Sequence, residues 1–328
     1  MIISRTPFRI SFAGGGSDLP SFYKKERGAV LSTSINKYMY LAIHPFFDQN
    51  KIQLKYSKTE TVSNINEITH PIFREVLKMY HLTGVDINSI ADVPSGTGLG
   101  SSSSFTVGLV NAIEAYLNRT VSSEFLAKKA CQIEIDLLKS PIGKQDQYAA
   151  AYGGLNFISF YPDEKVNLEI IIMDPIKKQE LEKNLIMIYT GDVRSANKIL
   201  EKQNAIIGKS DKFDCQRKMV SLTFDLKNVL IKNEIDDFGR ILNEGWMLKK
   251  SLTKAVSNSF IDEIYNKGIM AGSLGGKLLG AGGGGFILFY CPKEKQEHFR
   301  NEMSKYRELT FGFDHFGSKI IYIGNNGL

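Results

Sequence analysis

Residues 94–104 form a glycine and serine run whose composition suits the binding of a phosphate group. The run reads Pro-Ser-Gly-Thr-Gly-Leu-Gly-Ser-Ser-Ser-Ser, with glycines at positions 96, 98 and 100. Glycine lets the backbone approach a bulky anion closely, and serine hydroxyls can contact phosphate or its metal ion. The run is not a P-loop, which needs a lysine after its second fixed glycine, because no lysine occurs between Lys78 and Lys128.

The flanking residues place this run between a strand and a helix. Residues 85–93 alternate apolar and polar side chains, which is the period of a half-buried strand, and apolar residues recur at helical spacing over residues 105–117. A helix is therefore predicted to begin within residues 101–104, with its unpaired amides and positive dipole end directed at the anion. A flexible glycine and serine linker is the alternative, but such a linker rarely joins a strand to an apolar helix. The pattern favours a phosphate cradle.

Glu134 is a candidate because it interrupts an apolar stripe. A helix is predicted from a cap at Ser122 or Ser123 to about Lys139, and Glu134 lies four residues after Ala130 on its apolar side. A buried carboxylate there would need a partner, such as a metal ion. The alternative is a glutamate at the edge of the stripe that reaches water.

Asp146, Asp18 and Arg9 are candidates with plainer structural interpretations. Asp146 falls in the first turn of a predicted helix, where acidic residues complement the helix dipole. Asp18 follows the three glycines at 14–16 and could close an Asx turn, and Arg9 could be a solvated strand residue. Residue type alone favours these structural roles.

Composition describes an ordinary globular protein and excludes several classes. The chain has 328 residues, of which 43% are hydrophobic and 23% charged, and its net charge of +6 suits anionic substrates. Its lysines are spread along the chain, which argues against nucleic-acid binding. Three scattered cysteines argue against disulfides and a zinc site, and with no secretory signal or membrane span we expect a cytoplasmic protein.

Three segments resemble the motifs of the GHMP kinase family, which is named for galactokinase, homoserine kinase, mevalonate kinase and phosphomevalonate kinase. They are residues 5–18, 94–104 and 277–286, in the order that the family has them. The resemblance implies a two-domain α+β fold. Residues 1–180 would form an N-terminal domain of the ribosomal-S5-domain-2 type and residues 181–328 a ferredoxin-like C-terminal domain, with ATP bound between them.

The resemblance also implies roles for individual residues. Asp146 would be the catalytic base, since residues 143–147 match a galactokinase pattern, and Arg9 would keep it ionised and offset charge on the transferred phosphoryl group. Ser102 and Glu134 would bind Mg²⁺. The ATP phosphates would be held by Pro94, Ser95, Gly96, Thr97, Gly98, Leu99, Gly100, Ser101, Ser102, Ser103 and Ser104. The acceptor would be bound by Gly15, Gly16, Ser17, Asp18, Lys144, Arg194, Gly282 and Gly283.

Within the family, residues 13–18, 143–154, 190–195 and 280–286 resemble bacterial kinases that act on D-glycero-D-manno-heptose 7-phosphate. This implies ATP-dependent phosphorylation of the anomeric hydroxyl to the 1,7-bisphosphate, for nucleotide-activated heptose in capsule or lipopolysaccharide synthesis. Gly15 and Gly16 stand where galactokinases have Glu-His, which counts against galactose as the substrate.

Fucose kinases share parts of the pattern and are the alternative enzyme. A non-catalytic sensor of ATP and sugar is the alternative from another class, and the presence of Arg9, Glu134 and Asp146 argues against it.

As partners we expect ATP, Mg²⁺ and a sugar phosphate, but neither nucleic acid nor a membrane. A homodimer is left open.

Overall fold

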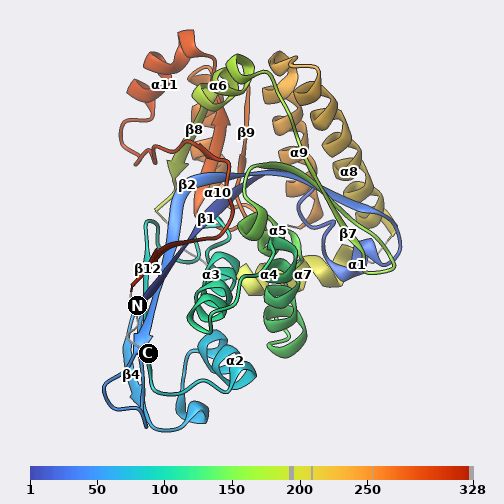
Figure 1. Ribbon diagram of the computed structural model, residues 1–328. Coiled ribbons are helices and arrows are strands. Elements are labelled where there is room, and N and C mark those ends of the chain that lie inside the picture. The colour runs from blue at the N-terminus through green and yellow to red at the C-terminus, as the bar shows by residue number, and fades with distance from the viewer. Residues whose placement is uncertain (192–195, 208–209, 254, 325–328) are drawn as a thin grey trace.

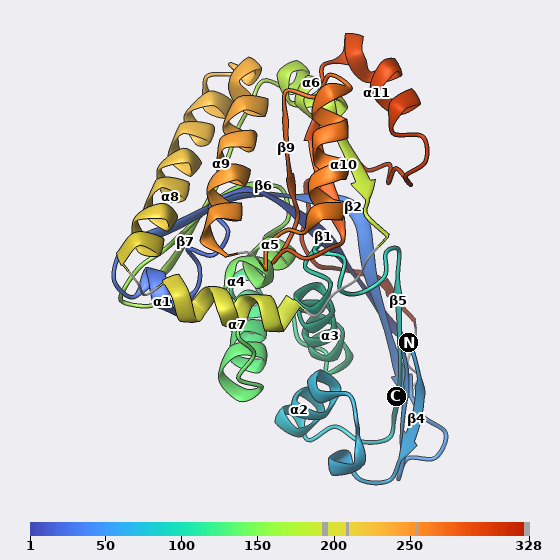
Figure 2. The same ribbon diagram turned by 180° about the vertical axis from the view of Figure 1, so that it is seen from behind.

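The computed structural model describes residues 1–191, 196–207, 210–253 and 255–324. In this part of the chain, one large sheet extends along the molecule, and a smaller sheet with its own helices lies at one end (Figure 1; Figure 2). This mixture of helices and sheets agrees with the predicted α+β class.

The large sheet is built around the long strand β2. Its strands are β1 (Ile2–Ala13), β2 (Gly28–Pro45), β3 (Ile52–Lys55), β4 (Thr59–Val62), β5 (Val85–Ala91), β6 (Leu155–Phe160), β7 (Val166–Ile170), β11 (Phe313–Asp314) and β12 (Lys319–Ile323). The order is β12-β1-β2-β5-β3-β4, with β6 and β11 also paired to β2, and β7 paired to β6. Residues 39–45 of β2 pair with β5 and residues 28–33 pair with β6. One long strand therefore links two parts of the sheet.

Helix α3 (Ser101–Tyr116) is the central helix on this sheet and carries the phosphate-cradle candidate at its start. It contacts β1, β2, α4 (Ser123–Cys131) and α5 (Gln145–Tyr152), and nearly all of its residues from 103 to 114 are buried. The predicted helix start is confirmed. The remaining helices of this part are α1 (Pro20–Tyr23), α2 (Pro71–Tyr80) and the 3-10 helix η1 (Ile65–Glu67).

The predicted helix over 122–139 is present, with one irregularity. The Ser122 hydroxyl accepts the Phe125 N–H at 3.1 Å, which confirms the predicted cap. After Cys131 the chain continues as a π-helix, η2 (Gln132–Leu137), which contains Glu134. Such wide turns often occur at functional sites.

The smaller sheet has the order β8-β10-β9 and its own helices. Its strands are β8 (Leu185–Tyr189), β9 (Gly275–Leu278) and β10 (Phe286–Tyr290). Helices α8 (Ser210–Ile231), α9 (Phe238–Leu252) and α10 (Ser259–Met270) lie beside one another near β9 in Figure 2. The other elements are α6 (Pro175–Asn184), α7 (Ala196–Ile207), η3 (Ile235–Asp237), η4 (Lys293–Lys295) and α11 (Gln296–Glu302). A separate core with Trp246, Tyr265 and Phe289 forms here.

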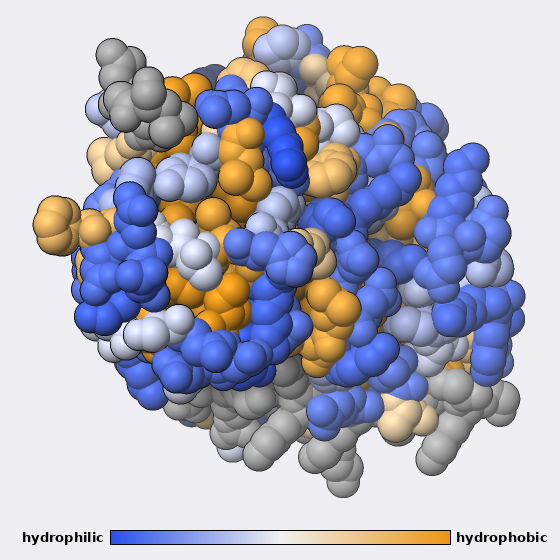
Figure 3. All heavy atoms as spheres, turned by 60° about the horizontal axis from the view of Figure 1, so that its bottom comes forward, coloured by the Kyte–Doolittle hydropathy of each residue, from blue (hydrophilic) through white to orange (hydrophobic). Residues whose placement is uncertain are grey.

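The end of the chain returns to the large sheet. Strand β12 pairs with β1 and β11 pairs with β2, although both strands follow the domain boundary predicted at residues 180 and 181. That boundary stays a prediction. None of the described helices combines the length and the apolar character needed to cross a membrane. The face seen in Figure 3 is mostly hydrophilic, with hydrophobic side chains in several separate patches, one of which lies in a hollow.

Candidate active site

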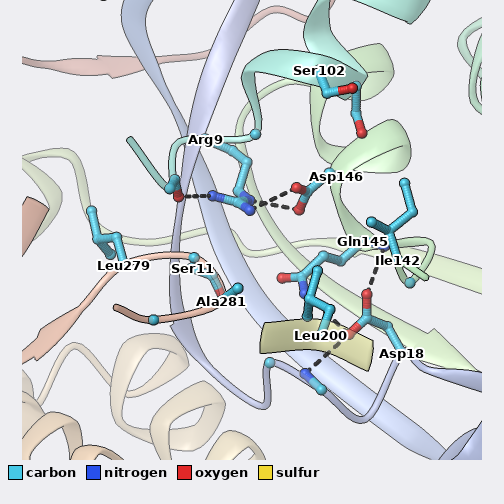
Figure 4. A pocket seen from close by; sticks show the side chains of 18 of the residues that line it. Arg9, Ser11, Asp18, Ser102, Ile142, Gln145, Asp146, Leu200, Leu279 and Ala281 are labelled. Carbon is cyan, nitrogen blue, oxygen red and sulfur yellow. Dashed lines mark hydrogen bonds and ion pairs between the residues drawn. The ribbon is translucent and has the colours of Figure 1, made fainter. Parts of the chain in front are cut away.

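A cavity lies where the start of α3, the glycine turn after β1 and the glycine loop between β9 and β10 meet (Figure 4). It brings together most of the residue positions that the three motifs predicted. The predicted residues that line it are Arg9, Gly15, Gly16, Asp18, Gly96, Gly98, Gly100, Ser101, Ser102, Ser103, Asp146 and Gly282. Segments more than 250 residues apart in sequence therefore share one site.

The loop before α3 has the geometry of an anion cradle. Gly96, Gly98 and Gly100 all have positive φ angles, of 77°, 85° and 75°, which favour glycine. Gly100 is the N-cap of α3 and offers no side chain to the first amides of the helix, so these amides are available to a ligand. A Cβ atom at Gly100 would lie 3.3 Å from Cγ of Arg9 and 3.4 Å from Oδ2 of Asp146. The cradle therefore directly adjoins these two charged groups.

The other predicted cradle residues do not line the cavity. Thr97 and Ser104 use their hydroxyls on the Pro94 and Pro7 carbonyls, at 2.9 and 2.8 Å. Leu99 is buried in the core, while Pro94 and Ser95 are exposed beside the loop. These residues shape the loop, and their contact with ATP stays a prediction.

Arg9 and Asp146 form a bidentate ion pair at the centre of the site. Nε and Nη2 of Arg9 each donate to one carboxylate oxygen of Asp146 at 2.7 Å, and Nη1 donates to the Gly98 carbonyl at 2.6 Å. Arg9 is buried in β1, whereas the side chain of Asp146, in the first turn of α5, is 24% exposed. The buried pair excludes the interpretation of Arg9 as a solvated strand residue. Asp146 keeps one side open to the cavity.

Asp18 is buried beside the start of α5. Its carboxylate accepts the Gly16 N–H at 3.1 Å, and the backbone and side-chain N–H groups of Gln145 at 3.2 and 3.0 Å. Burial, and then the charge of Asp146, raise the pKa of Asp18. Ser17 is turned away, since its hydroxyl pairs with the backbone of Ala29 in β2. The glycine turn thus presents Asp18 to the cavity and fixes Ser17 to the sheet.

Glu134 is fully buried and joins α3 to η2. Its Oε1 accepts the Ser102 hydroxyl at 2.7 Å, and its Oε2 accepts the Ser103 hydroxyl and the Gln147 amide at 2.8 and 2.7 Å. Burial raises the pKa of Glu134, and these three donors oppose that effect. The alternative of a solvated glutamate at the stripe's edge is therefore wrong. Ser102 lies between Glu134 and the cavity.

Two buried lysines line the cavity and were not predicted. The Lys249 ammonium on α9 donates to the Gly280 carbonyl, and that of Lys277 on β9 donates to the Ser11 and Phe12 carbonyls at 2.6 and 3.1 Å. Burial, then the charge of Arg9, lowers the pKa of Lys249 to about 8, while Asp18 acts in the opposite sense. Burial, then the charges of Lys249 and Arg9, lowers the pKa of Lys277 well below its usual value.

Of the two cations predicted to bind the acceptor, Lys144 does not line the cavity. The ammonium of Lys144 pairs with Glu164 and lies 4.7 Å from the centroid of the Tyr23 ring. Arg194 lies outside the described residues. Gly283 donates its N–H to the Val256 carbonyl, whereas Gly282 lines the cavity.

Comparisons with known proteins agree with this geometry. Residues 66–154 match the model of the GHMP kinase N-terminal domain, and residues 226–308 match that of the GHMP kinase C-terminal domain. A D-glycero-alpha-D-manno-heptose 7-phosphate kinase of Campylobacter jejuni is 29% identical, with 94% of this chain and 96% of that protein covered. A bifunctional fucokinase/GDP-fucose pyrophosphorylase of Arabidopsis thaliana is also 29% identical, over 92% of this chain but 31% of that protein.

Solved structures show the same fold. A D-glycero-D-manno-heptose 1-phosphate kinase from Bacteroides thetaiotaomicron superposes with a TM-score of 0.82 at 24% identity, with 99% of this chain and 100% of that chain covered. Mevalonate kinase of Methanococcus jannaschii gives a TM-score of 0.72 at 20% identity, with 95% and 98% covered. The predicted two-domain fold is confirmed.

Proposed function

We propose a phosphoryl acceptor for this chain, which belongs to the GHMP kinase family. Together with the heptose 7-phosphate kinase relative, this makes it an ATP-dependent sugar kinase, a phosphotransferase with an alcohol group as acceptor. The proposed acceptor is the anomeric hydroxyl of D-glycero-D-manno-heptose 7-phosphate. The product is the 1,7-bisphosphate, used for nucleotide-activated heptose and surface polysaccharides. The observation that carries this choice is the match to the Campylobacter jejuni heptose 7-phosphate kinase, which extends over nearly the full length of both chains.

The charges of the cavity support a phosphorylated acceptor. Arg9, Lys249 and Lys277 line it, and of these only Arg9 forms an ion pair among the described residues. Buried positive charge without an anionic partner is costly. Besides the phosphates of ATP, a sugar phosphate would supply such a partner, whereas a neutral sugar would not.

In the proposed mechanism, the acceptor hydroxyl approaches Asp146, which takes its proton as the new bond to the γ-phosphorus of ATP forms and the bond from that phosphorus to the β-phosphate oxygen breaks, releasing ADP. Arg9 holds both carboxylate oxygens of Asp146, so the base is fixed in orientation and the charge of the transferred group is partly offset. The amides at the start of α3 bind the nucleotide phosphates beside this pair. Catalysis then rests mainly on positioning and on electrostatic stabilisation.

The residues present also fit a magnesium ion. Ser102 lines the cavity and the buried carboxylate of Glu134 lies directly behind it, and both offer hard oxygen donors. No cluster of three or more His, Cys, Asp or Glu side chains suited to a metal occurs in the described residues, which fits an ion held by few protein groups together with phosphates and water. Ser102 and Glu134 would hold Mg²⁺, which when bound would offset the negative charge of the ATP phosphates.

We further propose that the enzyme works in the cytoplasm, where ATP is available and where its three cysteines, all free in the structure, stay reduced. A homodimer stays a prediction. A fucokinase is the second candidate, because the Arabidopsis thaliana relative is as similar in identity over most of this chain.

The first prediction tests the acceptor. ADP release is measured with heptose 7-phosphate, free heptose and fucose side by side. One charge-assisted hydrogen bond to the phosphate, worth about 1.5 to 3 kcal/mol, should favour heptose 7-phosphate over free heptose by at least roughly tenfold in kcat/KM. Faster turnover of either unphosphorylated sugar would exclude the heptose-phosphate assignment and leave the kinase assignment standing.

Arg194→Ala tests the predicted role of Arg194 in the same assay, where it should reduce the preference for heptose 7-phosphate without changing the KM for ATP.

A further inference from the structure

The wall of the cavity that faces Asp18 is supplied by the C-terminal half of the chain. In Figure 4, Leu279 and Ala281 lie on one side of the cavity with Ser11, and Asp18 and Gln145 lie on the other, below the Arg9–Asp146 pair. Lys249 reaches this wall from α9 and bonds the carbonyl of Gly280, next to Ala281. A cation from the second half of the chain therefore lines the cavity at the wall that faces Asp18.

Lys249 has fewer hydrogen-bond acceptors than the other two buried cations. Arg9 is paired with Asp146, and Lys277 donates to two backbone carbonyls of β1, which ties β9 to that strand. Among the described residues, no carboxylate forms an ion pair with Lys249, and its one hydrogen-bond acceptor is a neutral carbonyl. Its side chain is nevertheless buried, with the residue 6% exposed. A buried ammonium is costly without a charged partner, and Lys249 has none in the part of the chain that the structure describes.

A second group at the same wall also lacks a partner. The Ser11 hydroxyl lines the cavity, is buried, and has no hydrogen-bond partner in the described structure. The backbone carbonyl of Ser11 is one of the two that Lys277 binds. Buried hydroxyls are nearly always hydrogen-bonded, so this one points to a polar ligand group at the wall. An anion here would satisfy both Ser11 and Lys249.

We propose that Lys249 binds the phosphate that the acceptor already carries, and that it determines the preference for a phosphorylated sugar. This inference rests on the proposed function, since it assumes a sugar-phosphate acceptor. The nucleotide phosphates are served by α3 and its glycine loop, whereas Lys249 reaches the cavity from α9 and shares it with the unpartnered Ser11 hydroxyl. An acceptor with its reactive hydroxyl at Asp146 then extends past Asp18 and places its phosphate at the wall formed by Lys249 and Ser11.

The test compares Lys249→Met with Lys250→Met, a matched control on the same helix. The ammonium of Lys250 pairs with Asp262 at 3.2 Å and does not line the cavity. For Lys249→Met, kcat/KM for heptose 7-phosphate should fall at least about tenfold, mainly through KM. For free heptose it should change less than about twofold, and the KM for ATP should stay constant. Lys250→Met should match the wild type with both sugars. Melting curves establish that each variant is folded.

Lys249→Arg provides a readout that a purely structural role would not give. The charged groups that face Lys249 are Arg9 from β1, Lys277 from β9 and Asp18 from the glycine turn, with Asp146 of α5 beyond Arg9. Because the pKa of Lys249 is lowered to about 8, kcat/KM of the wild type for heptose 7-phosphate should decrease above about pH 8. Arginine stays protonated, so Lys249→Arg should restore part of the preference and remove this decrease.

Two results would overturn the inference, and they are distinguishable from each other. Equal losses of kcat with both sugars would show that Lys249 serves the transferred phosphoryl group. An unchanged preference in Lys249→Met would show that another residue binds the acceptor's phosphate. In both cases the wild type still prefers heptose 7-phosphate, so the proposed function stands. A wild type without that preference would overturn the proposed function and this inference together.

Discussion

At the scale of single residues, Arg9 both orients and stabilises the carboxylate of Asp146. Two parallel N–H donors fix the plane of that carboxylate, and a third N–H holds the carbonyl of Gly98 in the phosphate loop. The base, the cation and the cradle are thus one hydrogen-bonded unit. Backbone contacts around Asp146 set the shape of the site. A substitution of Asp146 should therefore lower the turnover rate much more than the stability of the fold.

We predict that Asp146→Asn folds and binds both substrates but loses most of its turnover. The amide keeps the shape of the carboxylate yet cannot accept the hydroxyl proton, and a general base typically contributes about 10²- to 10⁴-fold. The measurement is kcat together with the melting temperature. Asp48→Asn is the control, since Asp48 is an exposed carboxylate paired with Lys51 at 2.9 Å. A loss in kcat of less than about tenfold would show that Asp146 is not the base.

The sequence predicted the residues of this unit but not the lysines beside it. Arg9, Asp18 and Asp146 belong to segments that resemble family motifs, so the resemblance places them in one site. Lys249 belongs to no such segment, although it carries a signal of the kind that identified Glu134. It lies seven residues after Leu242 and three after Trp246, on the buried face of α9. A lysine on an apolar stripe indicates a buried charge, which is costly unless a partner such as a ligand offsets it.

At the scale of elements, the start of α3 and the π-helix η2 are held together by Glu134. Ser102 and Ser103 donate from α3, and Gln147 donates from α5, so one carboxylate joins three helical segments. The start of α3 and the Ser122 cap could be predicted, because both depend on local residues. The π-helix could not, since its extra residue per turn is stabilised by tertiary contacts such as these.

Glu134→Gln should raise the magnesium concentration needed for half-maximal rate. A neutral amide is a weaker ligand for a hard cation, and we expect a change of about tenfold, within the range for altered metal-site residues. Glu114→Gln is the control, because Glu114 is also buried and accepts the Tyr80 hydroxyl at 2.6 Å, but it does not line the cavity. An unchanged magnesium requirement in Glu134→Gln would leave Glu134 with a purely structural role.

At the scale of the whole molecule, the active site is assembled by close backbone contacts between the two halves of the chain. A Cβ atom on Gly98 would lie 2.6 Å from the Leu279 carbonyl, and one on Gly280 would lie 2.5 Å from Cα of Gly98. Lys277 adds its two hydrogen bonds to β1. Periodicity cannot predict such contacts, nor the return of β12 to β1, because both depend on residues far apart in sequence. The third glycine motif is therefore as important for the phosphate loop as the second.

Gly98→Ala should weaken both the fold and the binding of ATP. Gly98 has a φ of 85°, and moving a non-glycine residue into the left-handed region costs about 1 to 2 kcal/mol. The contact with Leu279 adds an overpacking cost of about 1 to 3 kcal/mol and displaces the loop that holds the nucleotide phosphates. Gly154→Ala is the matched control, because Gly154 has a φ of 79° but its added Cβ would meet only the His315 carbonyl, at 3.6 Å.

The measurements are the melting temperature and the KM for ATP of both glycine variants. Gly154→Ala should lower the melting temperature through backbone strain alone and keep the KM of the wild type. Gly98→Ala should melt at a lower temperature than Gly154→Ala and raise the KM for ATP at least about tenfold, since displaced amides lose charge-assisted hydrogen bonds to phosphate. Equal melting temperatures and equal KM values in Gly98→Ala and Gly154→Ala would show that the phosphate loop moves easily away from the second half of the chain. The phosphate cradle would then work without the glycine contact that joins it to Gly280.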